Sequence, residues 1–262
     1  MKKTTIRVLA GGLLSLFVAA LAMVSGDSVA DAGHGRPLDH FKCYVPDAPN
    51  SVVDIPDTAI QLQDQFDPNL HNATALDIQL FCNPTKKALA SGATTPISDP
   101  RAHLTWYRLD QGTTVTREVL IQNQFGQQTL TLPSGFVIRL AVPTKKNQHK
   151  FPADLDHFEC YLAQGDVLNI PVGLTDEFFS ENVNVFRAQF FCNPVRKVHA
   201  GATFGVQHLE EHLACYFFNP TVDFSKTVRI RNQFNPRLKL PVTQGQYLCV
   251  PTQKLAWRVV VP

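Results

Sequence analysis

The stretches LDHFKCY at residues 38–44 and LDHFECY at residues 155–161 decide the fold of this chain, because one seven-residue phrase occurs twice with a single change. In a β-strand, successive side chains point to opposite faces. Phe41 and Cys43 therefore share one face of the first phrase, and Tyr44 lies on the other. The phrase predicts a strand that begins two copies of a repeat, with Phe41 and Cys43 facing inward.

Further phrases return about 110 residues later, which is a typical domain length. The matched phrases are FCNPTKK at 81–87 with FCNPVRK at 191–197, IQNQF at 121–125 with IRNQF at 230–234, and AVPTKK at 141–146 with CVPTQK at 249–254. Self-similarity at a fixed period identifies repeat architectures. We therefore predict two similar domains, at 36–148 and 153–262, joined by the linker NQHKFPAD at 147–154.

Each half is itself doubled, which gives four quarters at 38–87, 102–146, 155–197 and 211–254. Every quarter opens with a phrase similar to HFxCY and closes with a phrase similar to LCxPxKK. Between the two lies a short third phrase. The copies of this third phrase are DQF at 64–66, NQF at 123–125, DEF at 176–178 and NQF at 232–234.

The residue pattern predicts an all-β fold. The stretch TVRIRNQF alternates Val228 and Ile230 with Arg229 and Arg231, and 18 prolines indicate many turns. Short alternating runs bounded by turn residues are typical of antiparallel sandwiches and barrels. We expect two tandem β-sandwich or barrel-like domains, each an internal two-fold repeat. A four-bladed propeller-like array is the alternative, which the distinct mid-chain linker disfavours.

Composition and the N-terminus indicate a secreted protein. The 24 basic residues nearly balance the 22 acidic ones, so the sequence lacks the basic excess of a nucleic-acid binder. Lys2, Lys3 and Arg7 precede the apolar run 8–24, and small residues follow that run. This layout predicts a bacterial signal peptide at 1–32 and disfavours a retained membrane anchor. The expected location is secreted, periplasmic or cell-surface, with no membrane association after cleavage.

The combination of HFxCY, NQF and LCxPxKK resembles a domain of unknown function that occurs in secreted bacterial proteins, usually in several copies. The resemblance covers nearly the whole of the expected mature chain. It implies a repeat architecture and no particular activity. The quarter at 102–146 departs from the pattern, since Trp106 and Ala141 stand where cysteines are expected.

The pattern of cysteines in the repeats indicates one disulfide pairing. Quarters one, three and four each have one cysteine in the opening phrase and one in the closing phrase, whereas quarter two has lost both together. Joint loss is expected if the two positions bond to each other. The predicted bridges are Cys43–Cys82, Cys160–Cys192 and Cys215–Cys249. Metal binding by these thiols is disfavoured, because no CxxC spacing occurs and exported chains are oxidised.

Histidines and tyrosines repeat at fixed positions in the opening phrase: His40, His103, His157 and His212, and Tyr44, Tyr107, Tyr161 and Tyr216. A residue that recurs in all four quarters serves the fold that the quarters share, so we interpret these residues as structural. The segment HLEEH at 208–212 lacks the HExxH arrangement and begins a strand, which separates its histidines. We predict no catalytic residues, no metal site and no cofactor.

Three functions are compatible with these observations. The favoured one is a non-catalytic, disulfide-stabilised β-repeat module that binds an extracellular or periplasmic protein or glycan, or has a structural role at the cell surface. The first alternative is a carbohydrate-binding module that stacks sugars on Trp106, Tyr107 and Trp257. The second is a hydrolase with its site between the two halves, which would need an asymmetric polar cluster in a cleft.

Overall fold

The computed structural model describes residues 36–47 and 53–261. The signal peptide predicted at 1–32 lies outside the described residues. No helix occurs in the described ranges, and the all-β prediction is confirmed. In this part of the chain there is accordingly no helix long and apolar enough to cross a membrane.

The strands form one antiparallel sheet of 16 members. In chain order they are β1 (Phe41–Pro46), β2 (Val53–Gln63), β3 (His71–Pro84), β4 (Lys86–Leu89), β5 (Thr94–Thr95), β6 (His103–Gly112), β7 (Arg117–Asn123), β8 (Gly126–Leu132), β9 (Val137–Lys146), β10 (His157–Leu162), β11 (Ile170–Thr175), β12 (Ser180–His199), β13 (Ala202–Phe204), β14 (His212–Phe218), β15 (Lys226–Arg231) and β16 (Leu238–Val259).

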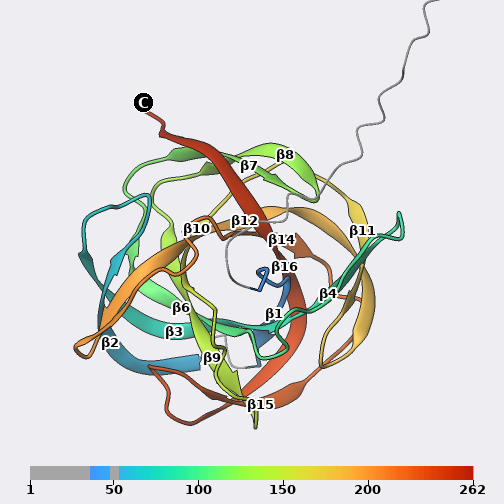
Figure 1. Cartoon of the computed structure of the whole chain (residues 1–262), viewed down its shortest axis with the longest axis horizontal. Coiled ribbons are helices and arrows are strands. Elements are labelled where there is room, and N and C mark those ends of the chain that lie inside the picture. The colour runs from blue at the N-terminus through green and yellow to red at the C-terminus, as the bar shows by residue number, and fades with distance from the viewer. Residues whose placement is uncertain (1–35, 48–52, 262) are drawn as a thin grey trace, which may run out of the picture. The chain divides into compact units, whose positions relative to one another are not determined.

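Eight of these strands pair in a closed ring. Within each quarter the opening strand pairs with the closing strand: β1 with β3, β6 with β9, β10 with β12, and β14 with β16. Neighbouring quarters are joined by β3 with β6, β9 with β10, β12 with β14, and β16 with β1. The first and last strands of the chain therefore lie side by side near the middle of Figure 1.

The middle strands of each quarter reach the opposite quarter. Strand β2 pairs with the end of β12, β7 with the end of β16, β11 with β4, and β15 with the end of β9. These additional strands mean that the sheet is not a simple barrel. It also differs from a propeller, whose blades are separate sheets.

The two halves share this continuous sheet. Strand β9 of the first half pairs with β10 of the second, and β1 pairs with β16, so the ring itself crosses between the halves at two places, in addition to the four pairings of the middle strands. The described residues belong to one compact unit. The division into two similar domains at 36–148 and 153–262 stays a prediction.

All eight ring strands contribute to one buried cluster, which contains the cysteines. Since only the enclosed side of a ring lets all its strands contact one another, this cluster fills the ring. Phe41 and Cys43 belong to it, whereas Tyr44 belongs to the second cluster, on the other face of the sheet. The inward direction predicted for Phe41 and Cys43 agrees with this alternation.

The three disulfides join residues that lie directly opposite each other in the opening and closing strands: Cys43–Cys82, Cys160–Cys192 and Cys215–Cys249. In quarter two, Trp106 lies opposite Ala141 at the equivalent place. The Trp106 side chain is fully buried and packs edge-on against Phe190, with ring centroids 5.5 Å apart. One large and one small side chain thus replace the bridge.

Candidate functional site

The repeated residues meet at four equivalent clusters, which we call junctions 1 to 4. Junction 1 consists of Tyr44, Asn83, His103, Lys146 and the loop 176–178. Tyr44 donates a hydrogen bond of 2.7 Å to Asp176, and the Asn83 amide donates one of 2.9 Å to the same carboxylate oxygen. Lys146 donates to Asn83 Oδ1 at 2.8 Å. Three quarters therefore contribute to one junction, with the loop coming from the opposite quarter.

Junction 3 repeats this arrangement with Tyr161, Asn193, His212, Lys254 and the loop 64–66. Tyr161 donates to Asp64 at 2.9 Å, and Asn193 donates to the same oxygen at 2.8 Å. Lys254 donates to Asn193 Oδ1 at 2.9 Å and also contacts Gln65 Oε1. Quarters one and three thus exchange their loops.

Quarters two and four exchange theirs in the same way. Junction 2 consists of Tyr107, Thr144, His157, Lys197 and the loop 232–234, and its Asn232 donates to Tyr107 at 2.7 Å and to Thr144 at 3.1 Å.

Junction 4 consists of Tyr216, Thr252, His40, Lys87 and the loop 123–125. Its Asn123 donates to Tyr216 at 2.9 Å and to Thr252 at 3.1 Å. Lys87 donates to Gln124 Oε1 at 2.5 Å, and His40 Nε2 lies 2.9 Å from the same oxygen.

Donor and acceptor types explain which residues go together. An ionised Asp only accepts hydrogen bonds, so its junction partner is Asn, which carries a donor. An Asn amide donates, so its partner is Thr, whose hydroxyl oxygen accepts. In all four junctions the tyrosine ring also meets the loop phenylalanine edge-on, with centroids 4.9 to 5.2 Å apart. The third phrase is therefore a clamp between opposite quarters.

The junctions hold histidines and lysines away from water. Burial lowers the pKa of His40 to about 4 and those of His157 and His212 to about 3, and it lowers that of His103 well below the ordinary value. These rings are neutral at pH 7. Burial also lowers the pKa of Lys197 to about 7 and those of Lys87 and Lys254 to about 8. The repeated histidines and tyrosines occupy equivalent structural positions.

Junction 1 differs from the other three. Its loop carries Glu177, where the other loops have Gln65, Gln124 and Gln233. A second histidine, His149 from the mid-chain linker, lies beside His103 with Nδ1 3.0 Å from His103 Nε2. His149 Nε2 is 3.7 Å from Glu177, and Lys146 Nζ is 2.5 Å from the same carboxylate oxygen.

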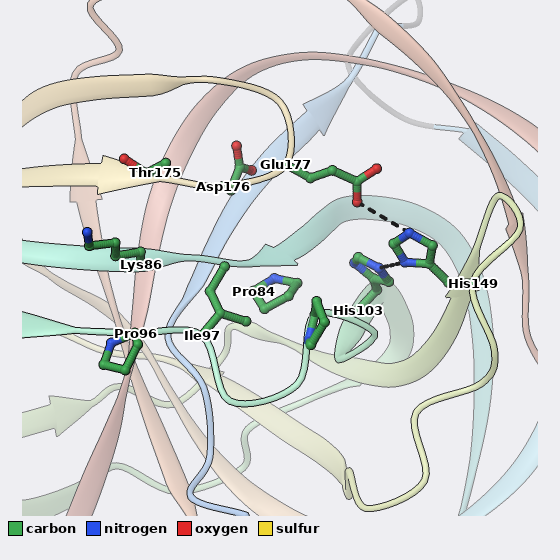
Figure 2. A pocket seen from close by; sticks show the side chains of 10 residues that line it. Pro84, Lys86, Pro96, Ile97, His103, His149, Thr175, Asp176 and Glu177 are labelled. Atoms are coloured by element: carbon green, nitrogen blue, oxygen red, sulfur yellow. Dashed lines mark hydrogen bonds and ion pairs between the residues drawn. The ribbon is translucent and has the colours of Figure 1, made fainter.

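His103, His149 and Glu177 border a hollow of about 490 Å³ between the two halves. Figure 2 shows His149 between His103 and Glu177, with Pro84 and Ile97 nearby. The full lining is Pro84, Lys86, Pro96, Ile97, Pro100, His103, His149, Thr175, Asp176 and Glu177. One side is thus apolar, and the other carries imidazoles and a carboxylate.

Sequence reasoning missed Glu177 and His149. Glu177 gives a detectable signal, because it departs from the glutamine of the three other loops. His149 gives none, since the linker at 147–154 has no counterpart in the repeat. His103 was interpreted as structural, and its proximity to the other two follows only from the fold.

The sugar-stacking platform expected of three aromatic residues does not form. Trp106 and Tyr107 are fully buried, in the two different core clusters. Trp257 is 40% exposed and packs edge-on against Phe66, with centroids 5.0 Å apart. The two histidines of HLEEH also have different surroundings, since His208 lies 2.7 Å from Asp154 whereas His212 is buried in junction 3.

Residues 103–223 match a family model described as a repeat of unknown function (DUF7450). The match extends from the start of quarter two, across the linker at 147–154, into quarter four. It agrees with the resemblance to an uncharacterised repeat family. No curated protein and no solved structure matches the chain.

Proposed function

We propose that the protein is a secreted, non-catalytic β-repeat module that binds an extracellular or periplasmic protein or glycan at the hollow beside junction 1. The observation that carries the proposal is asymmetry: four quarters share one junction design, and the hollow lies where one junction departs from it. Repeated features serve the fold, whereas a concave surface with unlike side chains is typical of a ligand site.

The lining supports binding better than hydrolysis. Both carboxylates of the lining already have partners in the protein, since Asp176 accepts from Tyr44 and Asn83, and Glu177 pairs with Lys146. The ten residues around the hollow include no serine or cysteine nucleophile. The apolar side formed by Pro96, Ile97 and Pro100 offers a partner surface that can exclude water.

Three disulfides are compatible with export, because disulfides persist in oxidising compartments and are rare in the cytosol. The charged and apolar N-terminus of the sequence supports the same location.

A matched pair of variants tests the binding role. Ile97 lines the hollow and ends the stretch SGATTPI at 91–97, and Val206 ends the similar stretch AGATFGV at 200–206 in the second half; both side chains are half-buried. The mature chain is used to capture partners from the native secretome, alongside Ile97→Arg and Val206→Arg. We expect Ile97→Arg to lose a partner that wild type and Val206→Arg both retain. Equal recovery by all three chains would show that the hollow is not the binding surface.

A further inference from the structure

We propose that His103, His149 and Glu177 form a binding site for a divalent transition-metal ion of the zinc class. The proposal goes beyond the partner-binding role, because the chain itself supplies the ligands whether or not a macromolecule is bound. Two imidazoles and one carboxylate are a ligand set that Zn²⁺ accepts, with a fourth position left for water or another ligand.

The geometry brings one ligand atom from each residue within 4.8 Å of the others. His103 Nε2 and His149 Nδ1 are 3.0 Å apart. The contact of His149 with Glu177 uses the other ring nitrogen, since Nε2 lies 3.7 Å from Glu177 Oε2, and the ring offers one nitrogen to the ion. Ligand atoms at about 2.0–2.2 Å from one Zn²⁺ lie roughly 3.3–3.6 Å apart in a tetrahedron. The side chain of Glu177 is 43% exposed, so it has the freedom to close the remaining gap.

The three other junctions provide an internal comparison. Each has one histidine at the equivalent position, and its loop carries a neutral glutamine. Where glutamine becomes Glu177, a second histidine also lies beside the first, and it comes from a linker that the repeat does not require. Among the described residues, this is the one group of three such side chains whose ligand atoms lie this close together. Two independent departures from the repeat thus meet at one place.

The protonation states suit a metal ligand. A metal binds neutral imidazole, and burial together with the charge of Lys146 lowers the pKa of His103 well below its ordinary value, which favours that form. The ammonium of Lys146 competes for Glu177, because the two groups are 2.5 Å apart. When an ion displaces it, Lys146 keeps its hydrogen bond to Asn83 and its position 4.6 Å from the Phe178 ring centre.

The open coordination position faces the hollow. His103, His149 and Glu177 are all part of its lining, opposite the apolar side that includes Ile97 (Figure 2). An ion held there is reachable from solvent and can take a further ligand without displacing a protein group. Closed four-ligand zinc sites serve structure, whereas open three-ligand sites bind or activate another molecule.

The test is a calorimetric titration of the untagged, metal-free mature chain with Zn²⁺ at pH 7. A parallel titration with Co²⁺ is followed by visible absorption, which reports coordination geometry. The variants are Glu177→Gln, which installs the residue of the other three junctions, and His149→Ala, which changes a linker side chain. The control is His208→Ala, because His208 is another accessible histidine beside a carboxylate, 2.7 Å from Asp154.

We expect one Zn²⁺ per wild-type chain, and a loss of affinity of about tenfold or more in Glu177→Gln and His149→Ala. The control variant should bind as wild type does. Absence of Zn²⁺ binding by the wild type overturns the proposal, and so does unchanged affinity in both cluster variants. A metal site can fail this test while the secretome capture succeeds, so the two proposals are decided separately.

Discussion

The opening strands of quarters one and three have nearly the same sequence, yet at the position where they differ one buries a lysine and the other a glutamic acid. Lys42 and Glu159 are both fully buried. Lys42 Nζ lies 2.6 Å from Glu181 and 3.7 Å from the centre of the Phe179 ring. Glu159 Oε1 lies 3.8 Å from His71 Nε2.

The residues that contact Lys42 and Glu159 also hold corresponding places in the repeat, since each follows the loop of the opposite quarter. Glu181 follows the loop 176–178 in quarter three, and His71 follows the loop 64–66 in quarter one. Each opening strand therefore meets the quarter that clamps its tyrosine. Burial, together with the charge of Asp64, raises the pKa of Glu159 well above its ordinary value, which favours the protonated form of this carboxyl. One backbone position thus holds an ion pair in one quarter and, in the other, a carboxyl whose environment favours the neutral form.

The largest effect is expected from Lys42→Met. This change leaves the Glu181 carboxylate buried and without its cation, which costs about 3–5 kcal/mol of unfolding free energy. Urea denaturation of the oxidised chain measures the loss. The double variant Lys42→Met/Glu181→Gln removes both charges and keeps an acceptor for Thr221, which bonds Glu181 through its backbone N–H and its hydroxyl. The double variant should recover most of the lost unfolding free energy. If it does not, the destabilisation comes from lost packing around Lys42 and not from the unpaired charge.

The disulfides of the same two quarters should have similar effects. Cys43–Cys82 and Cys160–Cys192 span 39 and 32 residues and join equivalent strands. In the chain-entropy model, loops of these lengths each contribute about 3–4 kcal/mol. Replacing both cysteines of one pair by alanine should therefore destabilise the protein to a similar degree in either quarter, as measured by urea denaturation. A difference above about 2 kcal/mol would show that the quarters are not energetically equivalent.

The smallest effect is expected from Glu159→Gln. A protonated carboxyl and an amide are similar in shape and both are uncharged, so the unfolding free energy near pH 5 should change by less than about 1 kcal/mol. The change should be visible in the pH dependence instead. Because the folded pKa is raised, the folded state binds an extra proton above pH 4.5, the ordinary value, and stability falls as pH rises toward the folded pKa.

Glu159→Gln removes this contribution, so its stability should decline less with rising pH than that of the wild type. Urea denaturation at a series of pH values from 4.5 to 8 measures the two slopes. An identical slope in both chains would mean that Glu159 titrates normally in the fold.

The sequence predicted the structure within each quarter: its opening strand, the faces of that strand and the positions that lie opposite each other. The alternation of Phe41, Cys43 and Tyr44 predicts strand and face, and the joint loss at Trp106 and Ala141 indicates which positions lie opposite each other. Hydrogen-bond partners between quarters were not predictable in this way, because nothing in β1 specifies that it pairs with β16. The closed ring of eight strands is therefore visible only in the structure.

The junctions were beyond sequence reasoning for a related reason. Tyr44 and Asp176 are 132 residues apart, and both were visible as repeated positions without any sign that they touch. The match of Asn with Asp and of Thr with Asn is a correlation that becomes interpretable only once the contact is known. Glu177 stood out as an exception, but its neighbour His149 belongs to no repeat.

The exchange of loops between opposite quarters has a consequence for how an exported chain folds. Disulfides link residues 32 to 39 positions apart, so each can form as soon as its own quarter has emerged. The tyrosine clamps span 93 to 132 positions, and β1 waits for β16. High contact order of this kind slows folding. Until the last strand arrives, β1 and β14 each present an unpaired edge, which is open to pairing with another chain.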